Sequence, residues 1–195
     1  MILQNLRKKL SGKYLSYYEL TYRLADGSTK AYEMVSKKGT TLNPEELTLE
    51  NIGQGIAAVV LLVLNEDHSK MLVSKEFRLG VNDWVVNDVA GLIDEGETVE
   101  QAAARELHEE TGLTLTKIIK VLPPTFTCAP VIDDRTSLVI CEAAGEIIGS
   151  DSPVEVINSK WYTKEEMKKL LEDETVTFAG RAQAFAYMWA YNGRL

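Results

Sequence analysis

The chain has 195 residues, of which 45% are hydrophobic, enough for one globular domain with a small appended element. Its formal net charge of −8 argues against general affinity for nucleic acids and anionic membranes, because both would be repelled. No apolar run reaches the roughly 20 residues that cross a bilayer, and residues 1–10 lack the apolar segment of a signal peptide. We therefore expect a cytoplasmic protein whose two cysteines, Cys128 and Cys141, are buried thiols.

The N-terminal part of the chain predicts an extension to the main domain. Residues 1–12 carry leucines at helical spacing among basic residues, which indicates a short helix or an arm. Tyrosine-rich alternating segments follow at 14–24 and 29–36, and the turn at 25–28 between them predicts a β-hairpin. Two strands are marginally stable alone, so we expect the hairpin to pack on the body of the protein or on another subunit. Residues 37–51 are expected to form a linker or loop.

The remainder predicts a β-rich domain with inserted helices. Strands are expected at 53–64, 70–78, 85–90, 115–122, 136–144 and 155–162. Helices are expected at 99–111, 163–173 and 180–191. Turns or loops are expected at 65–69, 82–84, 126–135 and 150–154. The last helix carries Phe185, Met188 and Trp189 at core spacing. This order is not a regular βαβ alternation, so the expected fold class is α+β or mixed α/β with helices flanking the sheets. We divide the chain into an N-terminal arm and hairpin at 1–50 and a second domain at 51–195.

The stretch at residues 91–113 carries the strongest chemical signal. It opens with a glycine-rich acidic loop, and Thr98 with Gln101 forms a capping-box signature for the start of a helix. Gly112 is placed to end that helix, because glycine is favoured just past a helix C-terminus. The stretch therefore predicts a loop, a helix and a second loop.

Three glutamates share one face of this predicted helix, since Glu106, Glu109 and Glu110 are spaced i, i+3 and i+4. Like charges at this spacing cost about 0.2 to 0.5 kcal/mol per pair. Arg105 can steady Glu109, but one guanidinium does not neutralise three carboxylates. A divalent cation does, and Mg²⁺ takes such oxygen ligands while it also binds substrate phosphates. The alternative interpretation is a solvated acidic helix face.

The same stretch resembles, at every specified position, the signature of the Nudix hydrolase family. That signature consists of Gly, five residues, Glu, seven residues, Arg-Glu, an aliphatic, any residue, Glu-Glu, any residue, Gly and an aliphatic. The resemblance implies an α/β/α sandwich with a mixed sheet at 51–195, and Mg²⁺, or Mn²⁺ in its place, as the cofactor. It also implies that Glu106 and Glu110 are the main metal ligands, with Glu109 and the Ala90 carbonyl as further ligands. The residues that it implies to be structural are Gly91, Glu97, Arg105 and Gly112, with an ion pair between Glu97 and Arg105.

The flanking sequence resembles the ADP-ribose pyrophosphatase branch of that family. The tyrosine-rich hairpin, residues 75–78 and Pro130 carry this resemblance. The branch places a catalytic carboxylate after the proline, which makes Asp133 or Asp134 the candidate general base or additional metal ligand. Two positions depart from the pattern. Arg135 stands where a glutamate is common, and Asn87 replaces a glutamate that often binds substrate.

Candidate substrate-binding residues lie outside the acidic stretch. Arg78 could clamp a phosphate with its planar guanidinium, and the alternative is a surface arginine paired with Glu76. Trp84 and Phe126, as well as Tyr17 and Tyr18, could stack a base, with ordinary packing as the alternative. The two histidines, His68 and His108, are expected to be surface residues.

The leading hypothesis is a Mg²⁺-dependent pyrophosphohydrolase acting on a small nucleotide. Its substrate would be ADP-ribose or a related nucleoside diphosphate sugar, cleaved to a nucleoside monophosphate and a sugar phosphate. The resemblance also implies a homodimer, with residues 1–50 as the dimerisation element. The alternatives are a house-cleaning hydrolase of modified nucleoside triphosphates and a non-catalytic nucleotide-sensing module.

Overall fold

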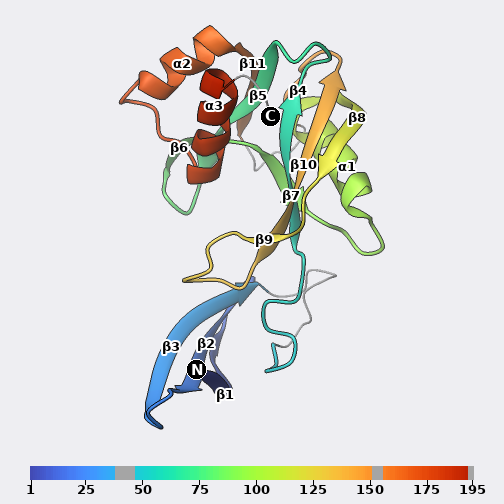
Figure 1. Cartoon of the computed structure of the whole chain (residues 1–195). Helices are drawn as coiled ribbons and strands as arrows, with labels where there is room; N and C mark the ends of the chain where they lie inside the picture. Colours follow the sequence, from blue (N-terminus) through green and yellow to red (C-terminus); the bar gives the residue numbers. More distant parts are fainter. Residues whose placement is uncertain (38–46, 151–155, 193–195) are drawn as a thin grey trace. The chain divides into compact units, whose positions relative to one another are not determined.

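The computed structural model describes residues 1–37, 47–150 and 156–192 (Figure 1). Most of the expected linker at 37–51 and of the expected loop at 150–154 lies outside these residues. The chain forms two compact units. Unit 1 comprises residues 1–58, 92–98 and 123–137, and unit 2 comprises residues 59–91, 99–122 and 138–195.

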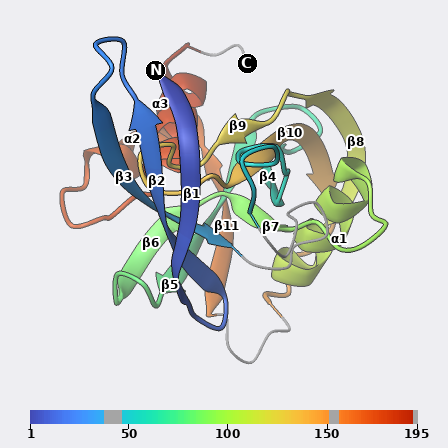
Figure 2. The same cartoon turned by 90° about the horizontal axis from the view of Figure 1, so that it is seen from below.

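Unit 1 contains an antiparallel sheet of three strands in the order β1-β2-β3 (Figure 2). The strands are β1 (Ile2–Ser11), β2 (Leu15–Arg23) and β3 (Thr29–Lys37). The predicted hairpin is confirmed as β2 and β3. Its turn has Gly27 at φ 85°, and the backbone N–H of Ser28 donates to Asp26 Oδ1 at 3.0 Å.

The prediction of a helix or arm at residues 1–12 is wrong, because these residues form β1. A register shift between Leu3 and Asn5 adds one residue to the strand, so Leu3 and Leu6 meet Tyr22 and Leu20 on one face of β2. Both leucines pack on the buried cluster of this sheet, Tyr18, Leu20, Met34 and Leu47. A β-bulge thus reproduces the leucine spacing that is typical of a helix.

Unit 2 contains most of a larger mixed sheet. Its strands follow the order β11-β5-β4-β10-β8, with β6 on β5, β7 on β4 and the short β9 on β10. Their bounds are β4 (Ala58–Leu64), β5 (Lys70–Arg78), β6 (Asp83–Asn87), β7 (Val89–Leu92), β8 (Thr114–Val121), β9 (Thr125–Phe126), β10 (Arg135–Ala144) and β11 (Ile157–Thr163). The central strand β4 is buried at all 7 positions, as its apolar sequence predicts.

The predicted strands at 70–78, 115–122, 136–144 and 155–162 are confirmed to within two residues at each end. The one predicted at 53–64 begins only at Ala58, and the one predicted at 85–90 is two strands, β6 and β7, which pair with β5 and β4. Trp84 was expected in a turn, but Asp83 and Trp84 begin β6. The turn lies at residues 79–82 instead, where the N–H of Val81 donates to the Arg78 carbonyl at 3.1 Å. Its last residue, Asn82, has φ 52°, a left-handed conformation that asparagine tolerates.

Helices cover both faces of the sheet in unit 2. Figure 1 shows α2 (Lys164–Glu172) and α3 (Gly180–Asn192) on one side and α1 (Val99–Thr111) on the other. The predicted start of α2 is confirmed, since Thr163 and Glu166 form a capping box. The mixed α/β fold class with helices flanking the sheet is confirmed as well.

The buried face of α3 differs in part from the expectation. Trp189 is 3% exposed and joins the core, but Met188 is 39% exposed. Ala182, Ala186 and Ala190 occupy the buried face instead, because residues four apart lie on one side of a helix. Their small size hides this stripe from a search for large apolar residues.

The two cysteines have different environments. Cys141 lies in β10 and is buried as expected, and burial raises the pKa of its thiol to about 12. Cys128 is exposed in the loop after β9, so the expectation of a buried thiol is wrong there. No helix in the described part of the chain combines the length and the apolar character needed to cross a membrane.

A buried ion pair ties the segment between β6 and β7 to α3. Arg181 Nε donates to Asp88 Oδ2 at 3.2 Å, and the Asp88 side chain is 1% exposed. Asp88 Oδ1 has no hydrogen-bond partner among the described residues. Burial raises the pKa of Asp88 to about 6, while the charge of Arg181 opposes this rise.

We expect Asp88 to make the stability of the fold depend on pH. The folded protein keeps the Asp88 proton up to about pH 6, whereas the unfolded chain releases it near 3.8, so the free energy of unfolding falls as pH rises through this window. Asp88→Asn removes this contribution. The difference in unfolding free energy between wild type and variant should change by about 1 to 3 kcal/mol between about pH 4 and pH 7, as measured by urea denaturation. Parallel pH profiles for the two proteins would contradict the assignment.

Candidate active site

The acidic face of α1 is organised around one arginine. Arg105 Nη1 donates to Glu106 Oε1 at 2.8 Å and to Glu109 Oε2 at 3.0 Å. The opposite face of the helix, with Ala103 and Leu107, is buried at 0% exposure. The helix is thus anchored in the core of unit 2, and two of its three carboxylates converge on a single cationic nitrogen.

Glu106 also lies against the backbone of β7. A Cβ built on Gly91 would overlap the Glu106 carboxylate, so only glycine leaves room for this side chain where it is placed. Gly91 has Ala90 as its neighbour in β7. The glycine at the start of the acidic stretch therefore has a steric role, which is to admit a carboxylate close to the main chain.

Gly112 ends the helix as predicted. Its φ is 77°, and its N–H donates to the carbonyl of His108 at 2.7 Å. A Cβ there would also overlap the side chain of Ile148. The next residue, Leu113, is fully buried, and His108 is exposed as expected.

The donor chemistry of this face fits a hard divalent cation. Carboxylate and carbonyl oxygens are the ligands that Mg²⁺ prefers, and Glu106, Glu109 and Glu110 supply carboxylates from adjacent turns of α1. Among the residues that the structure describes, no three His, Cys, Asp or Glu side chains are gathered as a ready metal site. Glu106 and Glu109 both contact the cationic side chain of Arg105.

The predicted phosphate clamp in β5 is engaged in an ion pair. Arg78 Nη1 lies 2.8 Å from Glu76 Oε1, and the Arg78 side chain is 49% exposed. Asn87 Nδ2 donates to the other oxygen of Glu76 at 3.3 Å, while Asn87 Oδ1 is buried without a partner in the described chain. Arg78 is thus paired with Glu76, the alternative that the sequence offered, while the contact of Glu76 with Asn87 was not indicated by the sequence.

Two candidate stacking residues pack against side chains of their own unit. Trp84 meets Phe77 edge to face, with ring centroids 5.7 Å apart, and Lys75 Nζ lies 5.9 Å from its ring. Phe126, in unit 1, is 50% exposed and has the Arg135 guanidinium 5.6 Å from its ring.

The two candidate carboxylates after Pro130 lie in unit 1, and both are buried. Asp134 Oδ2 accepts from Lys37 Nζ at 2.9 Å. Asp133 lines a cavity of about 310 Å³ together with Tyr22, Tyr32, Met34 and Phe126, among others. The Oδ1 atom of each aspartate is buried with no hydrogen-bond partner in the described residues. Lys37 lies 97 positions from Asp134, so no sequence pattern could pair them.

Glu97 closes the loop at residues 92–98 of unit 1. Its Oε2 accepts from the N–H of Asp94 at 2.9 Å, and its own N–H donates to the carbonyl of Asp94 at 3.0 Å. This arrangement gives Glu97 a structural role in the loop.

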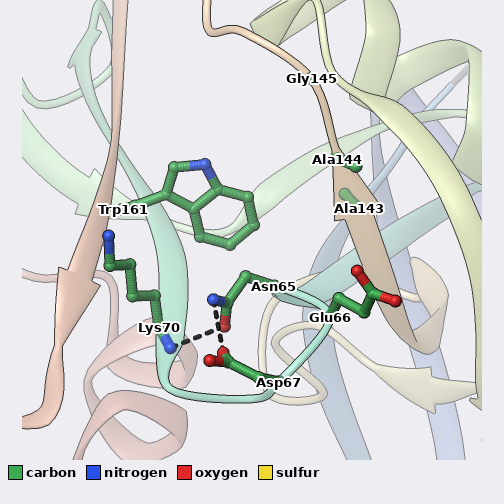
Figure 3. Close-up of a pocket in the computed structure, with 8 residues that line it drawn as sticks. All are labelled: Asn65, Glu66, Asp67, Lys70, Ala143, Ala144, Gly145 and Trp161. Atoms are coloured by element: carbon green, nitrogen blue, oxygen red, sulfur yellow. Dashed lines mark hydrogen bonds between the residues drawn. The ribbon is translucent and has the colours of Figure 1, made fainter.

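One cavity of unit 2 lies between the turn after β4, the end of β10 and β11 (Figure 3). It measures about 600 Å³ and is lined by the turn after β4, the end of β10 and Trp161. Its polar groups serve the turn itself, since Asn65 Oδ1 accepts from Lys70 N–H at 2.7 Å and Asn65 Nδ2 donates to Asp67 Oδ1 at 2.7 Å. No α1 residue lines it, so this cavity is distinct from the acidic face.

Comparison with known proteins identifies the family of the chain. Residues 54–180, more than half of the chain, match the NUDIX domain family. An ADP-ribose pyrophosphatase of Bacillus subtilis (strain 168) is 28% identical over 91% of this chain and 86% of its own length. An ADP-ribose pyrophosphatase of Escherichia coli (strain K12) is 29% identical over 68% of this chain and 66% of its own.

Solved structures show the same fold. The crystal structure of an ADP compounds hydrolase superposes with a TM-score of 0.72 at 19% identity, covering 98% of this chain and 95% of that one. The family match includes the whole acidic stretch and its helix. The chain therefore belongs to the Nudix family, whose members are pyrophosphohydrolases that act on phosphoanhydride bonds of nucleotide substrates.

Proposed function

We propose that this protein is a Mg²⁺-dependent pyrophosphohydrolase of ADP-ribose or a related nucleoside diphosphate sugar. The observation that carries the proposal is the convergence of Glu106 and Glu109 on one cationic nitrogen of Arg105, with Glu106 seated against Gly91. Relatives in Bacillus subtilis and Escherichia coli that bear the name ADP-ribose pyrophosphatase support the substrate class.

In this proposal the carboxylates of α1 hold the cation. Glu106 and Glu110 are the main ligands, Glu109 is a further ligand, and the Ala90 carbonyl adds another oxygen. When bound, the cation neutralises charge that develops on phosphoryl oxygens and lowers the pKa of the attacking water. Arg105 keeps two of the carboxylates together in the free protein, which reduces the repulsion among them.

The remaining proposed roles belong to substrate binding and proton transfer. Arg78 binds the diphosphate, and Glu76 holds its guanidinium in place until the substrate arrives. Trp84 and Phe126 offer aromatic faces to a base. Asp133 or Asp134 accepts the proton of the attacking water, because a positioned carboxylate is a competent general base.

A product assay tests this function directly. The purified protein with Mg²⁺ is expected to release AMP and ribose 5-phosphate from ADP-ribose, and to release neither in excess EDTA. The panel should include GDP-mannose, a dinucleotide and oxidised nucleoside triphosphates. Turnover of GDP-mannose alone would reject the substrate but keep the class. Pyrophosphate from a triphosphate would indicate a house-cleaning hydrolase, and nucleotide binding without any turnover would indicate a sensor.

Glu110→Gln tests the proposed cation site. The variant is expected to lose about 100-fold or more in kcat, because loss of a ligand charge weakens the binding of the cation. Glu100→Gln is the matched control, since Glu100 is an exposed glutamate in the first turn of the same helix. Equal rates for wild type and Glu110→Gln would overturn the ligand assignment.

Gly91→Ala tests the contact between β7 and Glu106. The overlapping atoms are at the end of a flexible side chain, so the variant should fold normally but displace the carboxylate. We expect kcat to fall about 10- to 100-fold with little change in Tm. Gly80→Ala is the control, because a Cβ there meets no atom within 4 Å. If both variants keep full activity, the close approach at Gly91 is not required for the reaction.

We also propose that the sheet of unit 1 forms a homodimer. Its strand β1 is an edge strand, and Leu10, which is 69% exposed, lies opposite Tyr17 in the β1-β2 register. Leu15, on the same face of β2 as Tyr17, is 44% exposed. Light scattering at micromolar concentration should give twice the 21.7 kDa chain mass, and Leu10→Asp should lower it. A monomeric wild type would count against the proposal.

A further inference from the structure

Strand β3 of the N-terminal sheet holds the loop that carries the two candidate carboxylates. It is an edge strand, and residues 130–132 cover part of its free side. The N–H of Val35 donates to the Val131 carbonyl at 2.9 Å, and Val35 forms a parallel bridge with Ile132. The Tyr32 hydroxyl donates to the Pro130 carbonyl at 2.6 Å. The loop is thus attached to the sheet through its main chain.

The loop is also closed on itself. The N–H groups of Val131 and Ile132 both donate to the carbonyl of Cys128, at 2.9 and 3.0 Å. At its base the N–H of Thr127 donates to the Asp134 carbonyl at 2.9 Å. A displacement at Asp134 therefore perturbs the hydrogen bond at the base of the loop.

Lys37 joins the end of β3 to this base. Its Nζ lies 2.9 Å from Asp134 Oδ2, and the Asp134 side chain is 5% exposed. A buried carboxylate that loses its cation is costly, whereas an exposed pair contributes little. The same sheet offers an exposed comparison, Lys9 with Glu19, at 3.3 Å and with both side chains about one third exposed.

Asp133 differs from its neighbour. It lines the cavity of about 310 Å³, and its buried Oδ1 has no hydrogen-bond partner in the described part of the chain. The Asp134 carboxylate is therefore paired with Lys37, whereas the Asp133 carboxylate lines the cavity and its Oδ1 can still accept a hydrogen bond. Because the residues are consecutive, fixing the main chain at Asp134 also fixes Asp133.

We propose that Lys37 and Asp134 form a latch that positions Asp133, and that Asp133 is the general base of the two. Lys37 and Asp134 are then positioning residues. The catalytic part of this inference rests on the proposed hydrolase function, whereas the latch itself does not.

Kinetics distinguish the two aspartates. Asp133→Asn should lower kcat about 100-fold or more, as expected for loss of a general base. Lys37→Met and Asp134→Asn should each lower kcat about 10-fold with KM little changed. The variant that carries both substitutions should be no slower than either single variant, because both substitutions break the same contact. Lys37→Arg, which keeps the charge, should restore most of the rate. Lys9→Met is the matched control and should match wild type.

Hydrogen exchange tests the latch without reference to activity. Lys37→Met and Asp134→Asn should speed exchange at the amides of Val35 and Thr127 by about 10-fold, and Asp133→Asn and Lys9→Met should not. Circular dichroism checks that each variant is folded, and Lys37→Gln replaces Lys37→Met if that variant does not fold. If no substrate is hydrolysed, the proposed function fails, and hydrogen exchange alone shows whether the latch exists.

Two results would overturn the inference. Unchanged exchange in folded Lys37→Met would show that no latch exists. A larger loss of kcat in Asp134→Asn than in Asp133→Asn, with exchange unchanged, would make Asp134 the general base.

Discussion

Electrostatic crowding on α1 is the constraint on which the site depends. Three carboxylates within two turns repel each other. Burial of the opposite face of the helix, which includes Leu107, offsets the cost of this repulsion. Arg105 offsets part of the repulsion through contacts with Glu106 and Glu109. A helix held by its apolar side can thus keep an acidic side, and in the proposed function that side binds a divalent cation.

The glycines of the acidic stretch serve this arrangement in different ways. Gly91 leaves the space in which the end of Glu106 lies against the main chain of β7. Gly112 allows the chain to leave the helix at positive φ and turn into β8. Neither role concerns reactivity directly, but each places a carboxylate or a helix end where a substitution with a side chain would move it.

The family match and the proposed substrate contacts rest on different residues, although both sets lie within residues 54–180. The NUDIX match covers residues 54–180, which contain the acidic helix and explain the reaction class. Two other positions, Asn87 and Arg135, depart from the pattern of the resembling branch. Both make contacts of their own, Asn87 with Glu76 and Arg135 with the ring of Phe126. Relatives at 28 to 29% identity therefore indicate a substrate class and leave the substrate to be measured.

The sequence by itself determined features that depend on neighbouring residues: the strand at 70–78, the helix start at Thr163 and the shared face of the α1 glutamates. Periodicity and spacing encode these, because side chains three or four positions apart on a helix, or two apart on a strand, meet the same surroundings. Tertiary structure alone decided that residues 2–11 form a bulged strand, that Cys128 is exposed, and that Lys37 reaches Asp134. Those outcomes depend on which distant segments pair, and a local pattern carries no information about a partner 97 positions away.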